Sequence, residues 1–158
     1  MKKCQIWLYG SLVVMLLTIA LLSTGSSVLN MALDTDDSIP LGTFITWAGI
    51  ISLPLCIYWG ISEMRNPTTK LNRFLSMLLK ISLGLAVLWV PISYLLAGNI
   101  SFSFAEREHF QGGQSAMRWF WRLSYGIPVT ALVALLTYWV SLLFKKKSQP
   151  EKDRTKNE

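Results

Sequence analysis

The sequence has 158 residues, of which 52% are hydrophobic, 12% aromatic and only 15% charged. Average soluble domains carry about 25% charged residues. Four windows contain no Asp, Glu, Lys or Arg, namely 4–33, 38–62, 81–105 and 123–144. Each window has at least the roughly 20 residues that an apolar helix needs to cross a bilayer. The composition therefore excludes an ordinary soluble domain, a disordered chain and a nucleic-acid-binding module.

The N-terminal apolar segment is predicted to form the first span, at about residues 6–29. It follows Lys2 and Lys3, so its start resembles the charged region of a secretory signal. The unbroken part from Ile6 to Leu22 is longer than the apolar run of about 7–15 residues in a cleaved signal. We therefore expect an uncleaved anchor. The alternative is a removed signal, which would leave three spans.

An acidic loop is predicted between residues 30 and 42. Its Asp34-x-Asp36-Asp37 pattern resembles part of a calcium-binding EF-hand loop. Counted from Asp34, the sixth and twelfth positions are Ile39 and Ile45, where that motif needs Gly and Glu. We therefore interpret the segment as a solvated acidic turn.

The second span is predicted at about residues 43–62 and carries aromatic residues near both ends. These residues are Trp47, Tyr58 and Trp59. Such rings are typical of the layer where lipid headgroups meet water. Pro54 lies inside this span and Pro91 inside the third, and each is expected to kink its helix.

The connection after the second span is basic. Arg65, Lys70 and Arg73 lie in it and can meet anionic lipid headgroups. Lys80 lies about one turn into the third span, which is predicted at about residues 75–98. Its long apolar stem can carry the ammonium group back to the interface.

The longest predicted loop, about residues 99–121, ends in an aromatic and basic stretch. This stretch consists of Arg118, Trp119, Phe120, Trp121 and Arg122. Its rings and guanidinium groups suit the outer membrane interface and can form cation–π pairs. We interpret the stretch as a helix anchor or, alternatively, as a docking surface for a partner or an amphiphile.

The fourth span is predicted at about residues 123–144. Gly126, Thr130 and Ala134 recur every four residues and form a small-residue stripe, which lets membrane helices approach closely. The neighbour is either another span of this chain or a second copy. Residues 145–158 are polar and charged, and we expect a disordered basic cytoplasmic tail.

No motif in the sequence combines the residue types needed for catalysis or metal binding. Ionisable side chains are missing from the depth of every span, whereas ion-coupled transporters usually carry one there. His109 is the only histidine, and with Glu106 and Glu108 it lacks the spacing of a zinc site. Cys4 and Cys56 lie in no external segment, so no disulfide framework is expected. We predict no metal, no cofactor and no enzymatic activity.

Several hydroxyl groups do lie within the spans. They belong to Thr18, Thr46, Ser52, Ser82, Ser93, Tyr94, Thr130 and Thr137. The simplest interpretation is that each bonds its own helix backbone or a neighbouring helix.

The distribution of charge predicts the orientation. Twelve of the fifteen basic residues lie on one side of the spans, and five of the nine acidic residues lie on the other. Basic residues in short loops stay on the cytoplasmic face. The residues expected to fix this orientation are Lys2, Lys3, Arg65, Lys70, Arg73, Lys145, Lys146 and Lys147. The pI of about 9.5 is then explained by topology rather than by a nucleic-acid partner.

The predicted fold class is an all-α membrane protein, an antiparallel bundle of four transmembrane helices with both termini cytoplasmic. Residues 1–144 would form a single domain. The Met-Lys-Lys start and the compact loops suit a multi-pass protein of a bacterial inner membrane.

We expect a non-enzymatic interaction protein that recognises a protein partner in the bilayer or at its outer face, in an immunity-like or envelope accessory role. In layout alone the chain is similar to the immunity proteins that protect against pore-forming colicins, and no motif carries this similarity. The alternative is an oligomeric transporter or channel subunit for a small solute. The expected partners are membrane lipid and either a membrane protein or a second copy of the chain.

Overall fold

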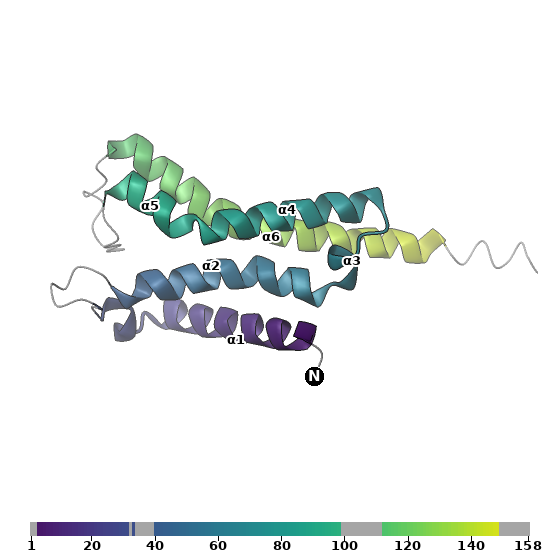
Figure 1. Cartoon of the computed structure of the whole chain (residues 1–158), viewed down its shortest axis with the longest axis horizontal. Coiled ribbons are helices and arrows are strands. Elements are labelled where there is room, and N and C mark those ends of the chain that lie inside the picture. Colours follow the sequence, from purple (N-terminus) through teal and green to yellow (C-terminus); the bar gives the residue numbers. More distant parts are fainter. Residues whose placement is uncertain (1–2, 32, 34–39, 99–111, 149–158) are drawn as a thin grey trace, which may run out of the picture.

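The computed structural model describes residues 3–31, 33, 40–98 and 112–148, and their regular structure is helical (Figure 1). The α-helices are α1 (Lys3–Thr24), α2 (Leu41–Gly60), α3 (Ser62–Arg65), α4 (Lys70–Val87), α5 (Trp89–Ala97) and α6 (Gly113–Ser148). One 3-10 helix, η1 (Ser27–Asn30), follows α1. The predicted all-helical class is confirmed for this part of the chain.

Three of these helices are long and apolar enough to cross a membrane. They are α1, α2 and the Gly113–Phe144 part of α6. The pair α4 and α5 passes the same test when taken together, with a bend of 54° between the two helices. The described chain therefore holds three candidate spans, or four if the bent pair is one span.

The bend between α4 and α5 lies at Leu88, three residues before Pro91. Proline has no N–H to donate to the carbonyl four residues earlier, which here belongs to Val87, and its ring crowds the preceding turn. Pro91 falls in the first turn of α5, where a missing N–H is tolerated. The kink predicted from Pro91 is thus present. By contrast, α2 continues as one helix through Pro54.

Helix α6 extends beyond the predicted fourth span at both ends. It begins at Gly113, so the stretch from Arg118 to Arg122 is helical rather than part of a loop. It ends at Ser148, so Lys145, Lys146 and Lys147 continue the helix. Residues 149–158 of the predicted tail lie outside the described residues.

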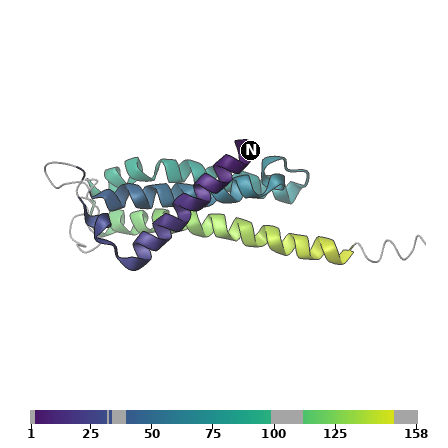
Figure 2. The ribbon, with the colours of Figure 1, turned by 90° about the horizontal axis from the view of Figure 1, so that it is seen from below.

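Helix α2 lies between α1 on one side and the α4–α5–α6 group on the other (Figure 1). Helix α1 packs along α2 and crosses it obliquely (Figure 2). Apart from α2, η1 and a contact of Cys4 with α3, α1 shares no extensive interface with the other described helices. On the other side, α4 and α5 both pack on α6, and α2 packs on α4 and α6.

Two apolar clusters form the core. The first contains Ile57, Met64, Leu75, Leu79, Ala131, Ala134 and Tyr138. The second contains Ala86, Trp89, Phe120 and Ile127. Both clusters include α6, which therefore runs the length of the core and holds α2, α4 and α5 together.

The polarity of the surface is the reverse of that of a soluble protein. Large apolar side chains face outward, including Leu95, Leu143 and Trp139, whereas Thr43 and Ser93 are almost completely buried. In membrane proteins the helix interfaces favour small and hydroxyl-bearing residues, because lipid solvates large apolar side chains well. This distribution fits a chain whose helices are surrounded by lipid.

Candidate functional site

The aromatic and basic stretch of α6 is held rigidly on one side. Phe120 is 5% exposed and its ring centroid lies 5.9 Å from that of Trp89 in α5. The indole Nε1 of Trp89 donates a hydrogen bond of 2.8 Å to Ser124 Oγ, one turn further along α6. These contacts fix the rotation of α6 about its axis at this point.

The opposite side of the same stretch is exposed. Trp119 is 61% exposed and Tyr125 is 62% exposed. The guanidinium of Arg122 lies 5.3 Å from the centre of the Trp119 ring, and Trp121 stacks on Tyr125 with centroids 5.4 Å apart. We call the exposed residues Arg118, Trp119, Trp121, Arg122 and Tyr125 the α6 ridge.

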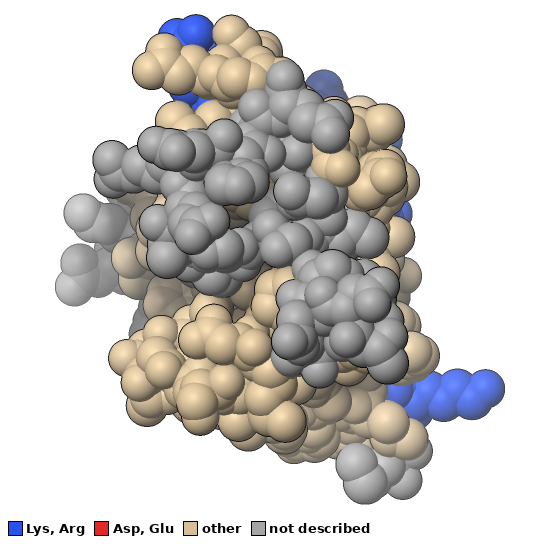
Figure 3. Space-filling view, turned by 90° about the vertical axis from the view of Figure 1, so that its left-hand side faces the viewer, with Lys and Arg blue, Asp and Glu red and all other residues tan. Residues whose placement is uncertain are grey.

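The ridge belongs to the end of the molecule where α5 ends and α6 begins. Figure 3 views this end, and among its coloured residues Lys and Arg appear only near the margins, with no acidic residue visible. Two groups of residues discussed from the sequence lie outside the described residues. They are the acidic turn of Asp34, Asp36 and Asp37 and the group of Glu106, Glu108 and His109. Within the described ranges no three His, Cys, Asp or Glu side chains are grouped to hold a metal.

The three residues of the predicted small-residue stripe of α6 are buried to different degrees. Ala134 is completely buried in the first cluster, Thr130 is half-buried, and a Cβ on Gly126 would meet nothing within 4 Å. Successive steps of four residues rotate by about 40° around a helix. The stripe therefore starts at the edge of the packed face and enters it only at Ala134, where Ala131 is its buried neighbour.

The other end of the molecule, where α3 lies, carries a polar network. Tyr138 of α6 donates a hydrogen bond from its hydroxyl to Glu63 Oε2 of α3. Ser76 Oγ of α4 donates to the Met64 carbonyl over 2.6 Å. The short helix α3 is therefore tied to both α4 and α6.

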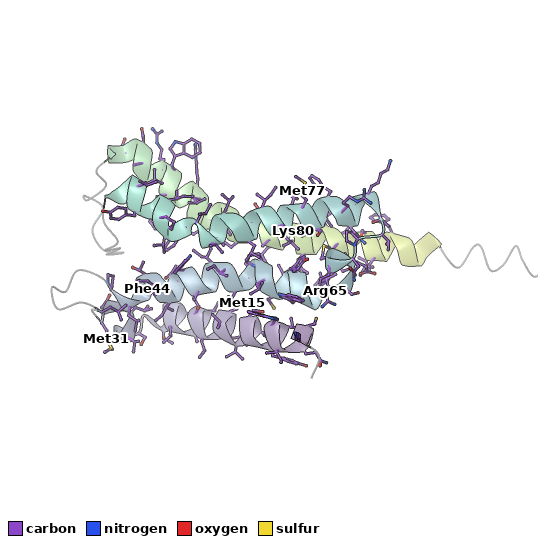
Figure 4. All side chains as sticks on the ribbon, viewed as in Figure 1. Met15, Met31, Phe44, Arg65, Met77 and Lys80 are labelled. Atoms are coloured by element: carbon purple, nitrogen blue, oxygen red, sulfur yellow. The ribbon has the colours of Figure 1, made fainter. Side chains whose placement is uncertain are left out.

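The same short helix also contacts α1 and α2. Arg65 lies at this end (Figure 4), and its Nη1 donates to Cys4 Sγ of α1. Its guanidinium also lies 5.7 Å from the centre of the Trp59 ring. Cys4 Sγ in turn donates to the Trp59 carbonyl over 3.6 Å. Arg65 thus has a specific structural role in addition to the orienting role predicted for it.

The remaining orienting residues are distributed around this end. Lys3, Lys70 and Arg73 are exposed at the starts of α1 and α4, whereas Lys2 lies outside the described residues. Lys145, Lys146 and Lys147 belong to the last turns of α6. The described basic residues are therefore placed at one end of the helices, with the exceptions of Lys80, further along α4, and the two arginines of the ridge.

Two of the hydroxyl groups singled out in the spans make the hydrogen bonds expected of them. Thr18 Oγ1 bonds the Ile45 carbonyl of α2 over 3.3 Å, and Ser52 Oγ bonds its own helix at Gly49 over 2.8 Å. By contrast, the buried hydroxyls of Thr46 and Ser93 have no partner among the described atoms.

Sequence reasoning missed Glu63, Tyr138, Trp89 and Ser124. Each pair joins residues far apart in the chain, 75 positions for Tyr138 and Glu63 and 35 for Trp89 and Ser124. The available signals were weak. Glu63 is an acidic residue near three basic ones, and Tyr138 lies near the end of a predicted span. Neither signal identifies its partner.

Comparison of the chain with protein families, with curated proteins and with solved structures found no match.

Proposed function

We propose that the chain crosses a bacterial inner membrane four times as an antiparallel bundle, with α4 and α5 forming one bent span and both termini in the cytoplasm. The network at the α3 end supports this proposal, because Cys4, α3 and Tyr138 meet there and bring the two terminal helices to the same end. The concentration of basic residues at this end supports its cytoplasmic placement. Reporter fusions to the two termini test it, and termini on opposite faces would refute it.

Within that membrane, the chain acts as a non-enzymatic recognition protein whose docking surface is the α6 ridge. The observation that carries this proposal is the two-sided character of residues 118–125. Phe120 packs into the core, while Trp119, Trp121 and Arg122 project outward. Arg122 contacts the Trp119 ring, and Trp121 contacts the rings of Phe120 and Tyr125. Exposed Trp, Tyr and Arg side chains on a rigid support are typical of the residues that dominate binding energy at protein interfaces.

A photo-crosslinking amino acid at position 119 tests the docking surface in intact membranes. Position 139 is the matched control, because Trp139 is 58% exposed on the same helix but lies towards its other end. We expect a discrete protein adduct from position 119 only, and its loss in the R122Q variant. Adducts with lipid alone, or equal protein adducts from both positions, would refute the proposal.

An immunity-like role predicts that the α6 ridge also affects resistance to pore-forming toxins. Overexpression of the wild-type chain should raise resistance to a pore-forming toxin, whereas W119A should raise it less at equal membrane abundance. Unchanged sensitivity across a panel of such toxins would refute the immunity-like role and leave the envelope accessory role. The adduct at position 119 tests the accessory role, because it identifies the bound protein.

A second candidate function, a small-solute transporter or channel subunit, is favoured by one observation. The α4–α5 pair is bent by 54° at Leu88, and broken spans frequently line substrate sites in transporters. The bend is braced, however, because Trp47 of α2 donates from Nε1 to the Ala86 carbonyl over 2.9 Å. A solute flux in reconstituted vesicles that is abolished by T130L would favour the transporter over the recognition protein.

A further inference from the structure

The α3 end carries more positive charge than its own acidic residues can balance. Glu63 is the one acidic side chain among the described residues, and it accepts the hydrogen bond of Tyr138. The described cations at or near this end are Lys3, Arg65, Lys70, Arg73 and Lys80, and the last turns of α6 add Lys145, Lys146 and Lys147. An anion from outside the chain would therefore be attracted to this end.

Among the described cations at the α3 end, Lys80 lies well inside its helix rather than at the helix start. It lies ten residues after the start of α4, about 15 Å along the helix at 1.5 Å per residue. Its ammonium lies 5.9 Å from the centre of the Tyr58 ring of α2. The ring attracts the cation without neutralising it. The ammonium is thus held beside α2 with its charge and its N–H donors available.

Lys80 faces the surroundings of the protein rather than its core. Its side chain is exposed on α4, as is the neighbouring Met77 (Figure 4). Arg73 lies about two helical turns earlier and therefore on the same face. Tyr58 is half-buried, and its ring marks the level of the lipid headgroups in the predicted orientation.

The surface beyond Lys80 fits a hydrocarbon chain. Gly84 follows Lys80 by one turn on the same face, and a Cβ placed there would meet nothing within 4 Å. A glycine within a helix is less favourable than alanine, and no neighbouring atom requires it at this position. Exposed Met77, Ile81 and Leu85 border the open space.

From this arrangement we propose that the edge between α2 and α4 binds one anionic phospholipid of the cytoplasmic leaflet. The phosphodiester group contacts the Lys80 ammonium and the Tyr58 hydroxyl, Arg73 meets the headgroup, and one acyl chain covers Gly84. This site rests on the membrane orientation proposed above, which the reporter fusions test separately, and it is independent of the docking surface on α6.

Native mass spectrometry of the purified chain in detergent tests the site with phosphatidylglycerol and phosphatidylcholine as probes. We expect wild-type protein to retain one phosphatidylglycerol in preference to phosphatidylcholine. K80Q should weaken that binding about tenfold, as expected for the loss of one charge-assisted hydrogen bond. Y58F should weaken it less, and G84L should weaken it by occupying the space of the acyl chain.

K3Q is the matched control, because Lys3 is also an exposed cation but belongs to α1 rather than to the edge between α2 and α4. It should leave the retained lipid unchanged. Equal binding of the two lipids, equal loss in K3Q and K80Q, or unchanged binding in K80Q would overturn the proposal. Displacement of phosphatidylglycerol by inorganic phosphate would overturn it too, since the anion would then be a small solute. If the circular dichroism of K80Q shows less helix than wild type, that variant is not folded correctly. Y58F then decides the outcome, because it removes only one oxygen atom, and unchanged lipid binding in Y58F would overturn the proposal.

Discussion

Helices α1 and α2 approach each other closely at Gly49, where substitution gives a sharp test of the packing. A Cβ at this position would lie 2.4 Å from Thr18 Cγ2 and 2.9 Å from Thr18 Cβ, well inside the ordinary contact distance of 3.4 Å or more. Thr18 cannot easily rotate away, because its hydroxyl is bonded to the Ile45 carbonyl. Valine at position 49 therefore forces α1 and α2 apart by about 1 Å, and a gap of that size removes roughly a quarter to a half of the van der Waals attraction across it.

Overpacking of this kind costs about 1–3 kcal/mol. The helix propensity of valine offsets little of that cost, because it exceeds that of glycine by only a few tenths of a kcal/mol, roughly 0.3. G49V should therefore lower the free energy of unfolding by about 2 kcal/mol. G10V is the matched control, because a Cβ on Gly10 of α1 would meet nothing within 4 Å, and it should change that free energy by less than about 0.5 kcal/mol.

Unfolding by SDS in mixed micelles, followed by circular dichroism, measures both values. A second readout is the rate at which a water-soluble maleimide labels Cys4 in a C56S background, because Cys4 contacts Trp59 and Arg65 at the far end of the α1–α2 interface. Labelling should accelerate in G49V and not in G10V. If the two variants unfold with equal free energies, the close approach of α1 and α2 at Gly49 is wrong.

Two further predictions concern hydrogen bonds that join distant parts of the chain. In a double-mutant cycle, Y138F and E63A should show a coupling free energy of about 1–2 kcal/mol in SDS unfolding, since each variant removes the hydrogen bond between the tyrosine hydroxyl and the carboxylate. Strictly additive effects would contradict the contact. W89F should destabilise the chain by about 1–3 kcal/mol because Ser124 then loses its indole donor. Adding S124A to W89F should lower the free energy of unfolding only slightly further. If S124A lowers it equally in the wild-type and W89F chains, the hydrogen bond between Trp89 and Ser124 is not made.

Much of the fold could be predicted from where charge is missing. The charge-free windows correspond to α1, α2, the α4–α5 pair and α6, and Pro91 located the bend to within one turn. These features depend on local composition and on the geometry of one residue, so a single sequence is sufficient to indicate them. The number of crossings and the orientation stay predictions until the reporter fusions are made.

The packed face of each helix could not be predicted in the same way. In water an apolar stripe identifies the buried face, but α1 and α2 are apolar on all sides, so their hydrophobic pattern does not distinguish lipid from protein. The residues that do mark the interfaces are small or hydroxyl-bearing, such as Ser11, Thr18 and Gly49. The stretch from Arg118 to Arg122 shows both limits. Its residues were identified from sequence, whereas the inward direction of Phe120 depends on Trp89, and Tyr125 joins the α6 ridge through its stacking on Trp121.

The placement of α6 has a consequence for how the chain matures. Both apolar clusters include α6 residues, Ala131 and Tyr138 in one and Phe120 and Ile127 in the other. Because α6 follows every other described helix in the sequence, neither cluster can close while the preceding helices are being synthesised and inserted. Leu79 and Trp89 therefore lack their final neighbours until α6 has been made, so the nascent chain passes through a stage in which α2, α4 and α5 are only loosely associated.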